Sequence, residues 1–360
     1  MPSLWIPSPG YPGDGGQNVY AAELPEGSVG ARVLPIGGAA IRGQAAARQD
    51  ERDRVGGMGL PDARRRVIGQ DPDDRVALVW VFILVFSAIL APLFVRFISH
   101  NGPNDIKPQL SNEFNIPVIG PGVQFWGGVD ALGRDVFVRT LYGARTSIQV
   151  ALFATAISVV IGLGLGLLGG YFGGKTDTFT SRLTDIVLSL PVFLLAIGIS
   201  ASCGVSPNGC LGGLLKPGVW LVTFIIALFG WTYIARIVRG QTLSLREREF
   251  VEAARATGFG RTHIMFREIL PNLVAPLIVY TTLLIPVNII FEASLSYLGV
   301  GIPPETPSWG RMIADATDGQ LYRFAWWMLF FPGVMLVLTT LAFNLVGDAL
   351  RDALDPRANR

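Results

Sequence analysis

The segment Ser147–Tyr171, SIQVALFATAISVVIGLGLGLLGGY, contains no charged side chain. About 20 apolar residues are enough for a helix to cross the ~30 Å hydrocarbon core of a bilayer, and helices in soluble proteins are usually much shorter. The segment therefore predicts a membrane-spanning helix. Its glycines Gly162, Gly166 and Gly170 recur at every fourth residue, a spacing that lets two membrane helices pack closely.

Five more apolar runs of similar length predict five further spans, at residues 76–98, 183–202, 219–237, 273–298 and 326–346. Apart from Arg96 near the end of the first run, the only charges inside them are Asp185, Arg236 and Glu292. Pro191, Pro276, Pro286 and Pro332 are predicted to kink the spans that contain them. The predicted fold class is all-α, a polytopic membrane protein with six transmembrane helices.

The composition supports a membrane protein and excludes other classes. Of the 360 residues, 50% are hydrophobic and 16% are charged, whereas soluble domains carry about a quarter charged residues. The net charge of +2 disfavours a nucleic-acid binder. The two cysteines exclude a disulfide-rich secreted scaffold.

The chain divides into four regions by composition. Residues 1–70 are rich in Gly, Pro, Ala and Arg and predict a flexible N-terminal tail without a signal peptide. Residues 71–140 contain the first span and an outer loop, and residues 141–350 contain the other five spans. Residues 351–360 form a C-terminal tail. Twenty-one of the 29 lysines and arginines fall on the side of the N-terminus, so both tails are predicted to be cytoplasmic.

The string Gly169–Thr176, GGYFGGKT, matches the phosphate-binding pattern G-x-x-x-x-G-K-[ST]. That pattern binds phosphate only where a strand leads into it and a helix leaves it. Here an apolar helix-length run leads into it. The string is therefore interpreted as a glycine-rich exit from the second span.

The most informative loop is EREFVEAARATGFGRTHIMFREILPN, residues 247–272. Its apolar spacing predicts a short helix that ends at Gly258, where a left-handed conformation suits glycine. A second helix is predicted from Thr262 until Pro271 breaks it. Taken alone, the loop fits a solvated amphipathic segment equally well.

Four strings of the chain together resemble a known family. Glu252-Ala253-Ala254-x-x-x-Gly258, followed by Leu270-Pro271, resembles the EAA loop of the membrane subunits of binding-protein-dependent ABC importers. The other strings resemble the C-type membrane subunit of dipeptide and oligopeptide permeases; they lie at residues 133–136 with 142–147, 292–299 and 307–310.

The resemblance implies a type I ABC importer permease (MetI-like) fold over residues 141–350 and a set of partners. The partners would be a homologous permease subunit in a heterodimer, two cytoplasmic ATPases and an extracytoplasmic binding protein. ATP and Mg²⁺ would be bound by the ATPases, so this chain would have no cofactor and would not be an enzyme. The implied location is the bacterial inner membrane.

The resemblance also implies roles for the loop. It would dock in a groove of an ATPase subunit, where Glu252 makes a polar contact. Ala253 and Ala254 would allow close approach, Gly258 would supply the turn, and Leu270-Pro271 would close the motif. ATPase closure would then rock the spans between inward and outward access.

Several other residues are candidates for a role. Glu292 either lines the translocation path or caps a helix, because an ionisable group inside a span is costly. Asp185 is predicted to make a helix contact. Trp309 is either an interfacial aromatic residue or a docking residue for the binding protein. Cys203 and Cys210 are predicted to form a disulfide in an outer loop.

No catalytic or metal site can be assembled from the sequence, because His100 and His263 are the only histidines and lie far apart. The favoured function is the permease subunit of an ATP-driven ABC importer for peptides or similar small solutes. Its main rival is a self-sufficient ion-coupled transporter, which needs intramembrane ion ligands. Peptides, nickel complexes and glycosides remain open as substrates.

Overall fold

The computed structural model describes residues 72–99, 101–113, 115–205, 218–300 and 302–354. Their backbone is mostly helical, with loops and two isolated β-bridges in the segment that precedes α3 (Val136–Phe172). The tail predicted at residues 1–70 lies outside the described residues, as do His100 and Cys210.

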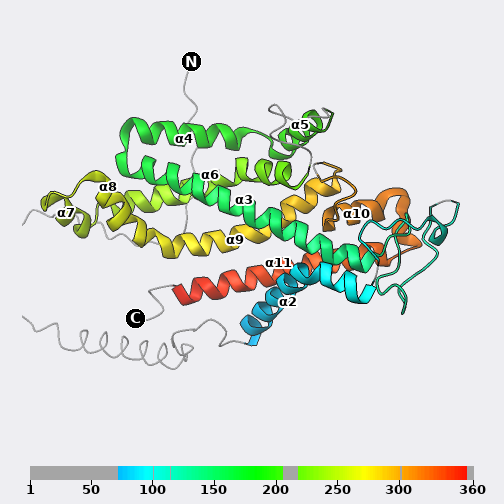
Figure 1. Cartoon of the computed structure of the whole chain (residues 1–360). Helices are drawn as coiled ribbons and strands as arrows, with labels where there is room; N and C mark the ends of the chain where they lie inside the picture. Colours follow the sequence, from blue (N-terminus) through cyan, green and yellow to red (C-terminus); the bar gives the residue numbers. More distant parts are fainter. Residues whose placement is uncertain (1–71, 100, 114, 206–217, 301, 355–360) are drawn as a thin grey trace, which may run out of the picture. The chain divides into compact units, whose positions relative to one another are not determined.

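Five helices are long and apolar enough to cross a membrane. They are α2 (Pro72–Phe94), α3, α6 (Val219–Leu245), α9 (Leu270–Tyr297) and α11 (Trp327–Leu354). A sixth crossing results if α4 (Gly174–Ser189) and α5 (Val192–Val205) count as one broken span. In Figure 1, α3, α6 and α9 run side by side, and α11 lies between α9 and α2.

The third apolar run, predicted as one span at residues 183–202 with a kink at Pro191, is interrupted at that proline, which confirms the kink. The chain breaks there into α4 and α5, which are bent by 80° relative to each other. Leu190 ends α4 in an extended conformation, with φ −81° and ψ 136°. The cause is Pro191, because a proline disfavours the helical conformation of the residue before it.

The close packing of α3 against α6 confirms the helix contact that the glycine spacing predicts. A Cβ atom on Gly162 would lie 2.7 Å from the Trp231 carbonyl oxygen, and one on Gly166 would lie 2.6 Å from the Ala235 oxygen. A Cβ on Gly170 would lie 2.6 Å from the Thr242 side chain. These three glycines let the α6 backbone approach α3 closely.

Helix α3 starts well before the predicted span. It begins at Val136, and the Asp135 carboxylate caps it by accepting hydrogen bonds from the Phe137 and Val138 amides at 2.9 and 3.2 Å. The helix therefore crosses residue 140, where the composition placed a region boundary. It projects beyond the apolar run toward the segment of residues 101–135.

The fifth span begins earlier than predicted, and Pro271 does not break the chain. One continuous helical stretch runs from Arg261 to Tyr297. It consists of α8 (Arg261–His263), the π-helix η4 (Ile264–Ile269) and α9, with Pro271 in the first turn of α9. Pro271 has no amide hydrogen to donate, and the first turn of a helix tolerates this. The π-helix η4, with its wider turn, directly precedes that position.

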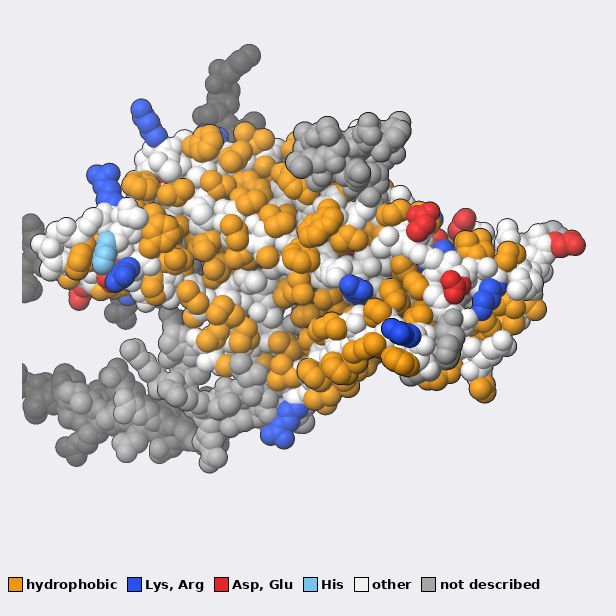
Figure 2. All heavy atoms as spheres, viewed as in Figure 1, with side chains coloured by type: hydrophobic (Ala, Val, Ile, Leu, Met, Phe, Trp, Pro, Cys, Tyr) orange, Lys and Arg blue, Asp and Glu red, His pale blue; other side chains and the backbone are white. Residues whose placement is uncertain are grey.

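Helix α11 extends to Leu354, so residues 351–354 of the predicted C-terminal tail are helical. Apolar side chains cover most of the face seen in Figure 2 between the end that carries α7 (Glu249–Ala256) and the end that carries residues 101–135. This surface is what a helical bundle in a lipid solvent requires.

Candidate functional site

The loop between α6 and α9 folds as a short helix followed by a left-handed turn. Helix α7 begins after Arg248 and ends at Thr257. The Gly258 amide donates to the Arg255 carbonyl oxygen, and the Phe259 amide donates to the Ala254 oxygen at 3.1 Å. Gly258 has a φ of +85°, which confirms the predicted left-handed turn.

Helix α7 has one face against its own subunit and one face exposed. Val251 and Ala254 are buried in a cluster with residues of α3, α6, η4 and α9, namely Leu167, Ile234, Val238, Ile264, Met265, Ile269, Leu273 and Leu284. Glu252 and Ala253 are exposed. This division anchors the helix on the bundle and leaves the other face for a partner.

The structure separates the two alanines of the predicted motif. Ala254 is 6% exposed and packs inside its own subunit, so the role predicted for it in close approach to a partner is wrong. Ala253 remains on the exposed face beside Glu252. Leu270 and Pro271 lie in the first turn of α9, where the loop joins the membrane span.

Glu292 is fully buried in α9. Its carboxylate accepts hydrogen bonds from Ser147 Oγ at 2.6 Å and from Ser296 Oγ at 2.7 Å. One turn earlier, Asn288 Nδ2 donates to Thr155 Oγ1 at 2.8 Å. These bonds join α9 to α3 and satisfy the buried carboxylate. The arrangement favours a packing role, and the translocation-path role of Glu292 stays a prediction.

Both interpretations of Trp309 are wrong. The residue is the first of α10 (Trp309–Thr317) and is fully buried. Its Nε1 donates to the Thr140 carbonyl oxygen of α3 at 3.0 Å, and its ring lies against Gly143. Trp309 therefore joins α10 to α3 and is not available at a membrane interface or for docking.

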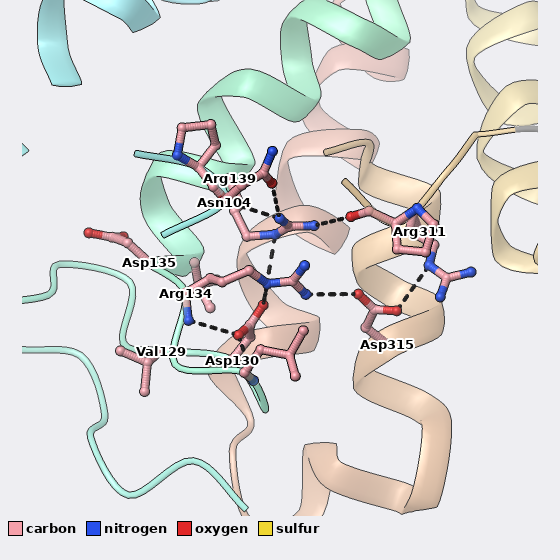
Figure 3. A network of polar contacts seen from close by, with 12 residues as sticks. Asn104, Val129, Asp130, Arg134, Asp135, Arg139, Arg311 and Asp315 are labelled. Atoms are coloured by element: carbon pink, nitrogen blue, oxygen red, sulfur yellow. Dashed lines mark hydrogen bonds and ion pairs between the residues drawn. The ribbon is translucent and has the colours of Figure 1, made fainter. Parts of the chain in front are cut away.

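A buried network of charges lies at the end of the bundle that carries residues 101–135 (Figure 3). Arg134 Nε donates to Asp130 at 2.6 Å, and its Nη2 lies 3.5 Å from the Asp315 carboxylate on α10. Arg139, 1% exposed, donates to the carbonyl oxygens of Pro103 and Pro304. The network thus joins the segment of residues 101–135 to α3 and to α10.

In this network three arginines pair with two aspartates, namely Arg134, Arg139 and Arg311 with Asp130 and Asp315. Burial raises the pKa of the Asp315 carboxyl, and the neighbouring Arg311 and Arg134 offset part of that rise. The sequence alone did not indicate that Arg134 and Arg139 are buried, although Arg134 belongs to one of the strings that carry the family resemblance. The signal for a structural role was Asp135, a typical N-cap residue that places both arginines at the start of a helix.

Two other predictions concern α4 and the turn that leads into it. Asp185 on α4 lies 3.3 Å from Arg236 Nη2 on α6, which confirms a contact between helices. The string Gly169–Thr176 joins the end of α3 directly to α4, so no strand leads into it. In the described ranges, no group of three or more His, Cys, Asp or Glu side chains is placed to hold a metal ion.

The disulfide stays a prediction. Cys203 lies in α5 and is fully buried, whereas Cys210 lies outside the described residues. We expect the two to be linked in the native membrane, because the stretch between them contains glycines and an outer compartment permits disulfides. Mass spectrometry of alkylated, non-reduced protein would detect a linked peptide pair. Two separately alkylated thiols would contradict the expectation.

Comparison with known proteins gives consistent matches. The family profile described as "binding-protein-dependent transport system inner membrane component" matches residues 158–360. The dipeptide transport system permease protein DppC of Alkalihalophilus pseudofirmus is 38% identical over 293 residues, which cover 81% of this chain and 90% of that protein. The oligopeptide transport system permease protein OppC of Bacillus subtilis is 36% identical over 287 residues, covering 79% of this chain and 86% of that protein.

A solved structure of the MetNI methionine ABC transporter in an inward-facing conformation is also similar. It is 19% identical, with a TM-score of 0.48, and the match covers 59% of this chain and 94% of the solved chain.

Proposed function

Because this chain belongs to the family of binding-protein-dependent transport system inner membrane components, we propose that it is the permease subunit through which an ABC importer moves peptides. Membership of the family favours this function over an ion-coupled secondary transporter. The names of relatives at 36% and 38% identity support the peptide substrate.

The observation that carries the proposal is how α7 packs on its own bundle, with one face buried and the other exposed. The helix buries Val251 and Ala254 against its own bundle and exposes Glu252 and Ala253. It is linked to α9 by the left-handed turn at Gly258 and the helical stretch from Arg261 onward. A force applied to the exposed face of α7 would therefore pass through the turn at Gly258 into the continuous helix that contains a membrane span.

We infer that the exposed face of α7 binds one of two cytoplasmic ATPase subunits, which hold ATP and Mg²⁺. A homologous permease subunit and an extracytoplasmic binding protein complete the complex. In this arrangement the present chain performs no chemistry. It converts closure of the ATPases into a change of access across the membrane.

The function is tested with the complete complex reconstituted in liposomes. We expect uptake of short peptides that requires internal ATP, Mg²⁺ and the binding protein, and that persists when a protonophore or a sodium ionophore collapses ion gradients. Uptake that follows an ion gradient and ignores ATP would overturn the proposal. Peptides retained by the purified binding protein, identified by mass spectrometry, would define the substrate length.

The orientation is tested by labelling single cysteines in a background with Cys203 and Cys210 replaced by serine. Val123 is 99% exposed in the outer loop, and Ser244 is exposed near the end of α6. We expect an impermeant maleimide to label Val123→Cys in intact cells and Ser244→Cys only after the cells are opened. Labelling of Ser244→Cys in intact cells would invert the proposed topology.

Glu252→Ala is expected to weaken attachment of the ATPase. A single polar contact between partners contributes about 1 to 3 kcal/mol, so uptake should fall without being abolished. Co-purification of the ATPases and peptide-stimulated ATP hydrolysis would be measured together. Unchanged values of both would remove Glu252 from the interface.

A further inference from the structure

A cleft of about 400 Å³ lies between the end of α3 and the turn that follows α7. Aromatic rings and two guanidinium groups line it together with one aliphatic side chain: Tyr171, Phe172, Phe259, Arg255, Arg261 and Ile264. The Phe259 ring stacks on His263, with centroids 4.3 Å apart and an interplanar angle of 7°. The coupling function assigned above leaves this cleft unexplained.

The two guanidinium groups give the cleft an uncompensated positive charge. Ion pairs at this end of the bundle join Arg239 with Asp177 and Arg246 with Glu247. In the part of the chain that the structure describes, no ion pair includes Arg255 or Arg261, and Arg255 reaches only the Arg246 carbonyl oxygen at 3.5 Å. The remaining carboxylates of the loop, Glu249, Glu252 and Glu268, do not line the cleft. An anion therefore suits it.

The position of the cleft indicates the source of the anion. Tyr171 and Phe172 end an apolar membrane helix, and tyrosine is enriched where such helices meet the lipid headgroups. An exposed apolar stripe continues from the cleft along α3, with Phe172 46% exposed, Leu168 39% and Ile161 39%. Such a stripe fits an acyl chain, whereas a soluble anion or an acidic side chain would find no polar or charged partner along it. Figure 2 shows Lys and Arg side chains at this end of the molecule.

We propose that this cleft binds the headgroup of an anionic phospholipid of the cytoplasmic leaflet. The phosphate would lie between Arg255 and Arg261, and an acyl chain would lie along Leu168 and Ile161. The inference rests on the proposed cytoplasmic orientation of the loop. Because the lipid would touch both α3 and the turn after α7, uptake should depend on the anionic lipid content of the membrane.

The test is native mass spectrometry of the complete complex with phosphatidylglycerol and phosphatidylcholine. We expect the wild type to retain phosphatidylglycerol preferentially. Each guanidinium near an anionic surface contributes about fivefold to binding, so R255Q/R261Q should weaken retention by about 25-fold. The control R248Q removes an exposed charge of the same loop that does not line the cleft, and it should retain the lipid.

A second pair of variants tests the acyl stripe without touching the loop. Leu168→Gln should weaken retention of phosphatidylglycerol. Leu152→Gln, at an equally exposed α3 position away from the cleft, should not. An excess of inorganic phosphate should leave the bound lipid in place.

Three results would overturn the inference. Displacement by inorganic phosphate, or no effect of Leu168→Gln, would indicate a soluble anion. Loss of the ATPases from R255Q/R261Q with unchanged lipid retention would indicate an acidic side chain of the ATPase. In each case ATP-driven uptake by the wild type would persist. Failure of that uptake in every lipid mixture would instead overturn the proposed function.

Discussion

Gly258→Val is expected to abolish peptide uptake while the subunit remains folded in the membrane. Gly258 has a φ of +85°, a conformation that β-branched residues strongly resist. A Cβ atom at this position would meet nothing within 4 Å, so the defect would come from the backbone alone. Backbone strain of this kind costs about 1 to 3 kcal/mol. The loop can relieve it by leaving the left-handed conformation.

That relief would redirect α7. The Gly258 and Phe259 amides cap the helix by bonding the Arg255 and Ala254 carbonyl oxygens, and both bonds depend on the left-handed turn. Without them the exposed face with Glu252 would meet the ATPase at a different angle. The turn is exposed and polar, so the membrane helices should still insert and pack.

Gly260→Val is the matched control. Gly260 is exposed, has nothing within 4 Å of a Cβ position, and has φ −67° and ψ 155°, which any residue adopts. Gly260→Val should keep most of the wild-type uptake. Gly258→Asn should retain more uptake than Gly258→Val, because asparagine tolerates the left-handed region. Uptake, ATP hydrolysis and ATPase co-purification would be measured. Wild-type uptake by Gly258→Val with its ATPases attached would contradict the coupling role.

Gly166→Leu is expected to prevent accumulation of a stable subunit. A Cβ atom at Gly166 would lie 2.6 Å from the Ala235 carbonyl oxygen and 2.9 Å from Val238 Cβ. The carbonyl belongs to the α6 backbone and cannot rotate away, so the two helices would have to separate. Overpacking typically costs about 1 to 3 kcal/mol, and separation would also expose the contacts made at Gly162 and Gly170.

The control for this prediction lies two residues away on the same helix. A Cβ atom at Gly164 meets nothing within 4 Å, so Gly164→Leu adds the same volume and hydrophobicity without a clash. Size-exclusion profiles and thermal unfolding midpoints in detergent would be compared for both variants. A Gly166→Leu variant that accumulates and unfolds like Gly164→Leu would show that the two helices are not held together at this position.

Features encoded by a few adjacent residues could be predicted from the sequence. A left-handed turn after the short helix favours a glycine, and Gly258 adopts that conformation. Close packing of a second helix on α3 followed from small residues at every fourth position, whereas the identity of that helix, α6, did not. Predictions failed where a distant neighbour decided the outcome. Ala254 shares the apolar helical spacing of Val251, but only the packing of η4 and α9 against that face showed that it serves its own subunit and not a partner.

The sequence by itself determined the class of the protein, the apolar helices, the position of the coupling turn and the break at Pro191. Each of these depends on local composition or on the backbone preference of one residue. Only the tertiary structure decided that Trp309 is buried, that the helix continues through Pro271, and that Arg139 joins the segment of residues 101–135 to the segment between α9 and α10. The physical reason lies in the solvent: lipid is as apolar as a protein core, so hydropathy locates a membrane helix without revealing which of its faces meets lipid and which meets protein.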